Sequence, residues 1–291
     1  MSIIEALILG IVQGLTEFLP VSSSGHLVLL SEFFGIEEGV LLFSIAVHLG
    51  TLLAVCIVFR DSIIWLIKNP LSARAVLLYV ATIPTLVIAL VVRVFVPGLL
   101  GAGGVPYFFL VTAVLLVVTE RVVKKVSSGL EKGVEYNASV SGASVSGGAT
   151  DTSQKDLRDT GNTNDTKQIS VKSAIVVGIA QGIAVLPGIS RSGATISAGL
   201  IMGESREEMA RFSFLLSIPI ILVSFVYEIL GAGGVLVAEF LLPALVGITA
   251  AFVSGMFAIK VMLRLVKKAN FSIFAVYLIF VAVLLLLWQN R

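Results

Sequence analysis

A carboxylate followed by a run of hydroxyl groups is the first part of the sequence that could do chemistry. Gln13 and Glu17 stand four residues apart, so on a helix they share one face. The run PVSSSGH (20–26) follows directly and adds three serines and His26, which can accept or relay a proton near neutral pH. Two other roles stay open at this point, because serine clusters also cap helices and an amide can simply bridge two helices.

A second polar turn, PGISRSGAT (187–195), is typical of an anion site. Its proline and glycine break a helix, and the residues that follow can open a new one whose unpaired N–H groups attract negative charge. Arg191 adds a planar fork suited to phosphate oxygens. The hydroxyls of Ser190, Ser192 and Thr195 can each donate a further hydrogen bond. An arginine placed there without an anion would be hard to justify, so the turn predicts a phosphate site.

The composition places these polar groups in a membrane. Of the 291 residues, 57% are hydrophobic and 13% are charged, and the mean hydropathy is +1.04, whereas soluble domains carry about 25% charged residues. A soluble enzyme or nucleic-acid binder is therefore disfavoured, and 20 basic against 18 acidic residues is too balanced for a polyanion partner. With Cys56 alone and two histidines, a disulfide framework and a multi-histidine zinc cluster are excluded.

Six stretches are apolar and long enough to cross a bilayer, which takes about 20 residues. They are residues 40–59, 75–92, 107–123, 212–230, 240–262 and 271–288. A region rich in Ser, Gly, Thr, Asp and Asn, residues 127–170, is predicted to be a flexible polar cytoplasmic linker between units 1–126 and 171–291. Lys and Arg gather in residues 60–74, beside the linker and before the last span, which predicts that these regions are cytoplasmic and both termini outside.

Both polar turns lie in segments that resemble each other. Five residues of the first recur at one constant spacing in the second, in the pairs Gly10/Gly178, Gln13/Gln181, Gly14/Gly182, Ser24/Ser192 and Gly25/Gly193. Each half is then one interrupted segment followed by three spans, and because three is odd the second half is inverted. The predicted fold is an all-α polytopic membrane protein with an inverted-topology repeat, six transmembrane helices and two re-entrant helix–loop–helix hairpins whose tips meet. Two kinked full spans are the alternative.

At this point the sequence resembles a known family, the membrane undecaprenyl-diphosphate phosphatases of the BacA or UppP type. The (E/Q)-x-x-x-E pattern at 13–17, PVSSSGH and PGISRSGAT match its motifs in order, within a resemblance that covers nearly the whole chain. The resemblance implies removal of the terminal phosphate from a polyprenyl diphosphate, with recycling of the lipid carrier for cell-envelope glycan synthesis and a link to bacitracin resistance. It also implies a multi-pass plasma-membrane protein whose site opens to the extracytoplasmic side.

The resemblance also implies residue roles. A divalent cation, Mg²⁺ or Ca²⁺, would be held by Glu17 and Gln13, although Gln13 replaces the more common Glu and so removes one oxygen ligand. The catalytic residues would be Glu17, Ser23, His26 and Arg191, with Ser23 as the favoured nucleophile. An activated water is the other candidate for the attacking group. The phosphate-binding residues would be Ser22, Ser24, Ser190, Arg191, Ser192, Gly193 and Thr195.

The sequence is also compatible with a second function and with several partners. An inverted repeat with a site near the midplane is the architecture of secondary transporters, so a lipid-phosphate or anion transporter (a flippase) is the alternative function. The expected partners are the lipid substrate and membrane lipids, without nucleic acid. Gly10-x-x-x-Gly14 could support close helix packing in a homodimer or within the hairpin. His48 lies inside a span, where we expect a packing role.

Overall fold

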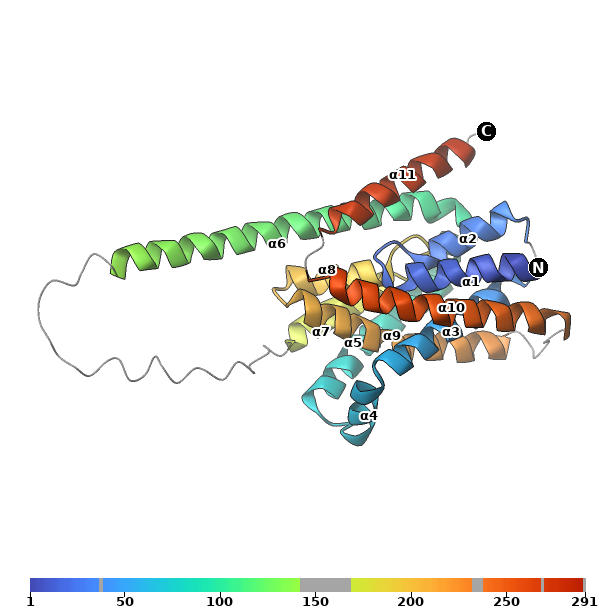
Figure 1. Cartoon of the computed structure of the whole chain (residues 1–291), viewed down its shortest axis with the longest axis horizontal. Helices are drawn as coiled ribbons and strands as arrows, with labels where there is room; N and C mark the ends of the chain where they lie inside the picture. The colour runs from blue at the N-terminus through green and yellow to red at the C-terminus, as the bar shows by residue number, and fades with distance from the viewer. Residues whose placement is uncertain (37–38, 142–168, 232–237, 268–269, 290–291) are drawn as a thin grey trace, which may run out of the picture.

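The computed structural model describes residues 1–36, 39–141, 169–231, 238–267 and 270–289 (Figure 1). Within those ranges the chain forms eleven α-helices and two 3₁₀ turns and contains no strand. The helices are α1 (Ile3–Phe18), α2 (Ser23–Phe33), α3 (Val40–Val58), α4 (Arg60–Lys68), α5 (Ala73–Phe95), α6 (Val105–Ser141), α7 (Val171–Ile183), α8 (Arg191–Ile201), α9 (Arg206–Gly231), α10 (Ala238–Leu265) and α11 (Ser272–Gln289). The 3₁₀ turns are η1 (Pro97–Leu100) and η2 (Ala102–Gly104).

Five of the described helices are long and apolar enough to cross a bilayer, namely α5, α6, α9, α10 and α11. A sixth span is formed if α3 and α4 are taken together, although the two are bent by 80° at their junction. The all-helical class and the multi-pass membrane character predicted from the sequence are therefore confirmed. The short helix α4 was not predicted, because its residues 60–68 are charged at both ends.

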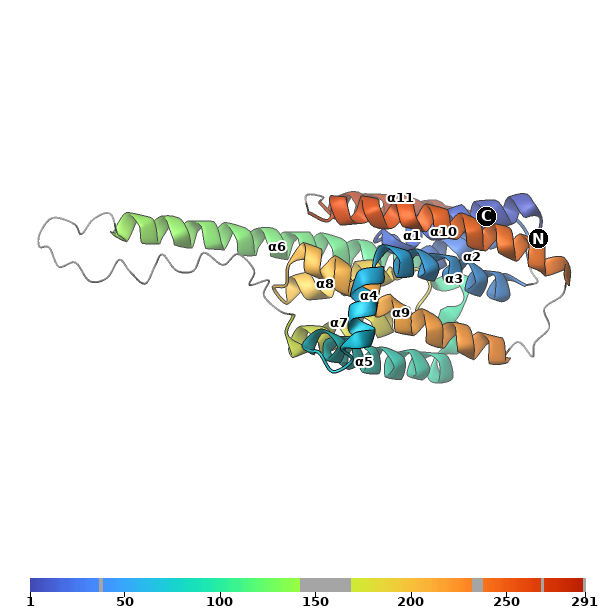
Figure 2. The same ribbon diagram turned by 60° about the horizontal axis from the view of Figure 1, so that its bottom comes forward.

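Helix α6 is much longer than the predicted span 107–123. It runs for 37 residues to Ser141 and projects beyond the other helices (Figures 1 and 2). The start of the linker predicted at 127 therefore falls inside a helix, and residues 142–168 lie outside the described ranges. The physical reason is that the run KKVSSGLEKGVEY (124–136) contains several strong helix formers, Lys, Leu and Glu, which continue the helix past the apolar stretch.

Small residues let the two short helices α1 and α7 pack closely on long spans. Helix α1 lies along α10, and α7 lies along α5. A Cβ atom added at Gly10 would stand 2.5 Å from the Gly247 carbonyl oxygen, and one at Gly14 would stand 2.5 Å from that of Ala251. The Gly10-x-x-x-Gly14 pair therefore serves a helix contact within the chain, with α10 as the partner.

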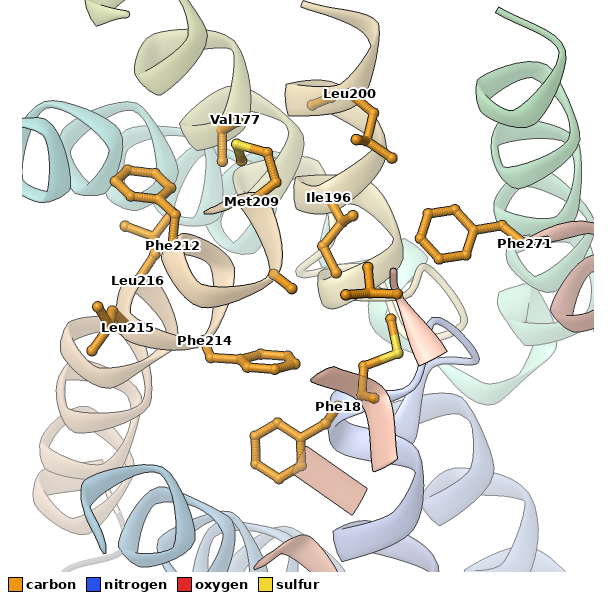
Figure 3. Packing of buried hydrophobic residues seen from close by; sticks show 14 of the residues in the cluster. Phe18, Val177, Ile196, Leu200, Met209, Phe212, Phe214, Leu215, Leu216 and Phe271 are labelled. Atoms are coloured by element: carbon orange, nitrogen blue, oxygen red, sulfur yellow. The ribbon is translucent and has the colours of Figure 1, made fainter. Parts of the chain in front are cut away.

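The apolar core lies next to the polar turns. Phe18, the last residue of α1, packs edge-on against Phe214 of α9, with ring centroids 5.4 Å apart. Ile196 of α8 belongs to the same cluster and is 1% exposed (Figure 3). The ends of α1 and α8 that carry the polar turns are therefore fixed against α9 by close-packed side chains.

Ion pairs fasten the first turn of α9 to its neighbours. Arg206 donates to Glu120 of α6 at 2.9 Å, and Arg74 of α5 donates to Glu208 at 3.0 Å. Glu120 also accepts the backbone N–H of Phe271 at 3.4 Å, next to the start of α11. Because Glu120 is 5% exposed, its bonds hold α6, α9 and α11 in a fixed relation.

Candidate active site

The turn between α1 and α2 is built around Ser22. Its hydroxyl caps α2 by accepting the backbone N–H of Gly25 at 3.4 Å, and it also accepts that of Gly188 at 3.1 Å. Ser22 has φ +65°, and it is the one non-glycine residue with a positive φ in the described ranges. Such a conformation costs about 1–3 kcal/mol and persists only where surrounding contacts impose it. These contacts therefore hold a strained turn directly before Ser23, the first residue of α2.

The turn between α7 and α8 is held by α6. Thr112 of α6 donates its hydroxyl to the Gly188 carbonyl oxygen at 3.0 Å and accepts the backbone N–H of Ser190 at 3.1 Å. Gly188 has φ +105°, a left-handed conformation that suits glycine. The Ser190 hydroxyl then caps α8 by accepting the backbone N–H of Gly193 at 3.1 Å. Sequence reasoning missed Thr112, because nothing in its surroundings marks it apart from other span residues.

Hydrogen bonds join the two turns. The backbone N–H of Gly188 donates to the Ser22 hydroxyl, and the Ser192 hydroxyl donates to the Leu19 carbonyl oxygen at 2.9 Å. The N-termini of α2 and α8 therefore lie side by side, with the positive ends of both helix dipoles in one place. This arrangement can bind an anion with more than one negative charge.

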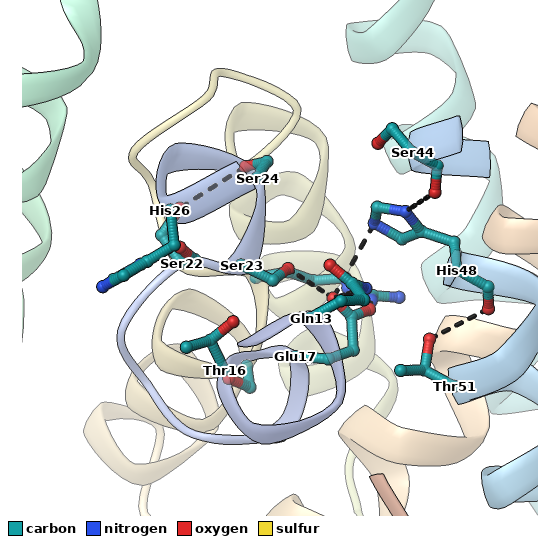
Figure 4. Close-up of polar contacts among 12 residues, drawn as sticks. Gln13, Thr16, Glu17, Ser22, Ser23, Ser24, His26, Ser44, His48 and Thr51 are labelled. Atoms are coloured by element: carbon teal, nitrogen blue, oxygen red, sulfur yellow. Dashed lines mark hydrogen bonds and ion pairs between the residues drawn. The ribbon is translucent and has the colours of Figure 1, made fainter. Parts of the chain in front are cut away.

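Glu17 is the centre of the site (Figure 4). Its Oε2 atom accepts hydrogen bonds from Gln13 Nε2, at 3.0 Å, and from the Ser23 hydroxyl. Its Oε1 atom forms an ion pair with Arg191 Nη2, and the Glu17 side chain is 2% exposed. The structure thus brings together four residues predicted from the sequence. A carboxylate that accepts the hydroxyl proton of a serine is placed to act as its general base.

His48 of α3 also faces Glu17, which the sequence interpretation missed. Its Nε2 atom lies 3.8 Å from Glu17 Oε2, and its Nδ1 atom donates to the Ser44 carbonyl oxygen at 2.6 Å (Figure 4). The packing role expected for His48 does not include this proximity to the Glu17 carboxylate. Because a polar side chain inside a span is costly and usually faces a site, the position of His48 in the span could have indicated this contact.

His26 lies on the far side of the turn from Glu17. Its Nδ1 atom donates to the Ser22 carbonyl oxygen at 2.7 Å, and its Nε2 atom is 2.7 Å from the Tyr277 hydroxyl of α11. Neither nitrogen bonds Ser23 or Glu17, and Figure 4 shows the ring directed away from the carboxylate. The structure therefore separates His26 from the other three predicted catalytic residues and adds Tyr277, which sequence reasoning missed.

The other predicted phosphate-binding residues divide into two groups. Ser24 and Ser192 stay at the joined turns, where Ser24 Oγ is 3.4 Å from that of Ser22 and Ser192 Oγ is 3.3 Å from that of Ser190. Thr195 instead bonds the Arg191 carbonyl oxygen at 2.8 Å and the Ser213 hydroxyl of α9 at 2.6 Å. Its hydroxyl therefore ties α8 to α9.

Besides Glu17 Oε1, which is ion-paired with Arg191 Nη2, two polar atoms of the site are buried without a hydrogen-bond partner in the described part of the chain, Arg191 Nη1 and Gln13 Oε1. An unsatisfied buried group costs about 1–3 kcal/mol, and more when it is charged, so each points to a ligand. A guanidinium calls for an anion, and an amide oxygen calls for a donor or a cation. The described residues contain no group of three or more His, Cys, Asp or Glu side chains that could hold a metal ion by themselves.

The comparisons with known proteins agree with one another. The family described as "Bacitracin resistance protein BacA" matches residues 6–284. Among curated relatives, the "Undecaprenyl-diphosphatase" of Carboxydothermus hydrogenoformans is 40% identical over 99% of this chain and 98% of its own length. The protein of that name from Treponema denticola is 36% identical over 96% and 94%. That of Halothermothrix orenii is 34% identical over 99% and 98%.

Proposed function

Since this chain belongs to the bacitracin resistance protein BacA family, we infer that it is an undecaprenyl-diphosphatase. It hydrolyses undecaprenyl diphosphate to the monophosphate and inorganic phosphate, which recycles the lipid carrier of cell-envelope glycan synthesis. The observation that carries this function is the arrangement around Glu17. One buried carboxylate contacts both a serine hydroxyl, on Ser23, and a guanidinium, on Arg191.

We propose that α1–α2 and α7–α8 are re-entrant hairpins of an inverted repeat. The exchange of partners between the halves supports this, because α1 packs on α10 as α7 packs on α5, and α3 contacts α9. The basic residues of the regions 60–74 and 260–268 support a cytoplasmic position for those loops. The site then opens to the extracytoplasmic side of the plasma membrane.

In the proposed reaction Ser23 attacks the terminal phosphorus atom in line with the leaving oxygen. Its hydroxyl proton passes to Glu17, with which it is already hydrogen-bonded, and the undecaprenyl monophosphate departs. Glu17 passes that proton to the departing monophosphate and is a carboxylate again. A water molecule then attacks the phosphoserine, giving one proton to Glu17, which returns it to the Ser23 oxygen as the Ser23–phosphorus bond breaks and inorganic phosphate is released. If water attacks the substrate directly, Glu17 activates the water and Ser23 only binds phosphate.

Arg191 has a different partner before and after the substrate binds. In the described structure Nη2 is paired with Glu17 while Nη1 is unsatisfied. We propose that the terminal phosphate bonds Nη1 and the N-terminus of α8, which neutralises the charge that spreads over the transferring group. The phosphate also draws the guanidinium away from Glu17, which leaves the carboxylate more basic towards Ser23.

A divalent cation, Mg²⁺ or Ca²⁺, fits one part of this site. The unsatisfied Gln13 Oε1 and the Glu17 carboxylate are hard oxygen donors of the kind both ions prefer. Because the described residues supply so few such donors, the phosphate oxygens would complete the coordination. When bound, the cation would supply further neutralisation of the diphosphate charge.

The function is tested by phosphate release from undecaprenyl diphosphate in detergent micelles, where no vectorial transport can occur. If the protein is a phosphatase, we expect it to release phosphate over many turnovers, at a rate that a chelator lowers and that added Mg²⁺ or Ca²⁺ restores. The lipid-phosphate transporter alternative needs an anion site but has no need for a serine bonded to a carboxylate. Folded, cation-supplied protein that binds the lipid without releasing phosphate would support the transporter instead.

A further inference from the structure

Tyr277 makes a long-range contact that the proposed reaction does not use. It belongs to α11, in the second half of the chain, and its hydroxyl lies 2.7 Å from His26 Nε2 on α2. The two rings are parallel within 3°, with centroids 5.7 Å apart. Helix α11 packs mainly on α6. The Tyr277 side chain therefore connects α11, through His26, to the turn before Ser23.

The direction of each hydrogen bond follows from the acceptor. A carbonyl oxygen can only accept, so the Nδ1 atom of His26 must carry the proton that is donated to the Ser22 carbonyl oxygen. In the neutral ring Nε2 then has a lone pair, and the Tyr277 hydroxyl donates to it. Tyr277 thereby holds His26 in the one tautomer that can bond Ser22.

The end of this chain of bonds is the strained turn. Ser22 has φ +65° and stands immediately before the proposed nucleophile, Ser23. His26 bonds its carbonyl oxygen, and Gly188 bonds its hydroxyl, so the residue is held from both halves of the chain. Loosening one of these contacts allows the backbone to leave the strained conformation, which moves the Ser23 hydroxyl away from Glu17.

From these contacts we propose that Tyr277 is a positioning residue of the phosphatase site, acting through His26 and Ser22 on Ser23. The inference rests on the proposed function. The Tyr277 hydroxyl, and not its ring, provides this positioning. The Tyr277 side chain is 42% exposed on an apolar helix, where a phenylalanine would pack equally well.

The first test is Tyr277→Phe, which removes the hydroxyl and keeps the ring. We expect kcat to fall by about three- to tenfold, the fold-change typical of one lost hydrogen bond, with KM unchanged because no substrate contact is lost. Tyr79→Phe is the matched control, since Tyr79 is 53% exposed on the apolar helix α5. It should leave kcat as in the unmodified protein, and an unchanged kcat in Tyr277→Phe would overturn the proposal.

A double-mutant cycle separates positioning from packing. His26→Asn keeps a donor for the Ser22 carbonyl oxygen but is too short to reach Tyr277. We expect Tyr277→Phe to lower kcat in the His26 background and to have no further effect in the His26→Asn background. Equal losses in both backgrounds would mean that Tyr277 acts through packing alone, which contradicts the proposal.

A spectroscopic measurement tests the same contact without using activity. The chain has two histidines, so ¹⁵N-histidine labelling gives two rings, and His48→Gln assigns them. The His26 ring should carry its proton on Nδ1, and its Nε2 resonance should shift in Tyr277→Phe. No shift overturns the inference whether or not the protein releases phosphate. If the Nε2 resonance shifts but the protein releases no phosphate, the contact is confirmed and the proposed function is wrong.

Discussion

The helices α2 and α8 begin in the same way and then carry different chemistry. Each is 11 residues long and is capped by a serine, Ser22 or Ser190, whose hydroxyl accepts the N–H of a glycine three residues on. The first residue after the cap is Ser23 in one helix and Arg191 in the other. The same capped helix start thus places the proposed nucleophile, Ser23, on one helix and the arginine proposed to bind phosphate, Arg191, on the other.

The helices that precede them, α1 and α7, also share one polar residue and differ in another. Gln13 and Gln181 stand at equivalent positions on α1 and α7, but Glu17 of α1 corresponds to Val185 after α7. Only the first hairpin therefore has a carboxylate to accept a proton. In the proposed reaction both halves therefore bind anionic groups through capped helix N-termini, while proton transfer is confined to the first half.

The largest expected effect comes from the serine that distinguishes α2. Ser23→Ala removes the hydroxyl that is bonded to Glu17 and should lower kcat by about 10⁴–10⁶-fold, as when a member of a nucleophile–base unit is removed. Phosphate release in detergent measures it. Ser128→Ala, at an exposed hydroxyl on α6, is the control and should leave kcat unchanged. Retention of a tenth or more of the activity in Ser23→Ala would favour direct attack by water.

The arginine that distinguishes α8 is next in size. Arg191→Lys keeps a positive charge but loses the planar fork, and we expect kcat to fall by about 10²–10³-fold. Arg191→Ala should also destabilise the fold by about 3–5 kcal/mol, because it leaves Glu17 buried and unpaired. Adding Glu17→Gln to Arg191→Ala should recover stability and not activity. Denaturant titration followed by helical circular dichroism checks the stability part, and recovery of activity would contradict the assigned roles.

The features of the fold and the site that depend on local sequence pattern could be predicted from the sequence. The apolar runs predicted the spans, and the recurrence of Gly10 as Gly178 predicted two similar segments. The two broken segments carried Glu17, Ser23 and Arg191, which the structure places in contact. These residues have strong local signatures because proline, glycine and charge are costly at membrane depth.

The missed residues act through contacts between distant helices. Thr112, His48 and Tyr277 each lie on a span and face a polar turn from another part of the chain. Their function depends on which face of the helix points inward, and apolar spans carry little periodicity to show it. The separation of His26 from Ser23 was unpredictable for a similar reason, because the side on which a ring leaves a strained turn depends on its tertiary partners.

The glycines that seat the two hairpins give a smaller expected effect. A Cβ atom at Gly14 would meet the Ala251 backbone at 2.5 Å, whereas one at the equivalent Gly182 would meet the Ile88 side chain at 2.7 Å. Because a side chain can shift and a backbone cannot, Gly14→Ala should destabilise by about 1–3 kcal/mol and Gly182→Ala by less. Thermal unfolding in detergent compares them with Gly103→Ala, where there is open space. An equal loss in all three would refute the packing argument.

The caps give the smallest effect and the sharpest comparison. Ser190→Ala removes one cap and should cost about 1 kcal/mol of unfolding free energy. Ser22→Ala should cost more, because the Ser22 hydroxyl also accepts the N–H of Gly188 and its loss leaves that donor unpaired. Denaturant titration of both variants provides the test. A larger loss in Ser190→Ala would show that the strained turn is not held by its serine.

Trapping a phosphoserine intermediate tests whether Ser23 is a nucleophile activated by Glu17. A single turnover of undecaprenyl diphosphate is quenched in acid within milliseconds, and the peptide containing Ser23 is examined by mass spectrometry. If Ser23 is the nucleophile, we expect a phosphoryl group on Ser23 that forms and decays fast enough to account for turnover, and that is absent in Ser23→Ala. Full-rate turnover without a burst and with Ser23 unmodified at every time point would contradict it.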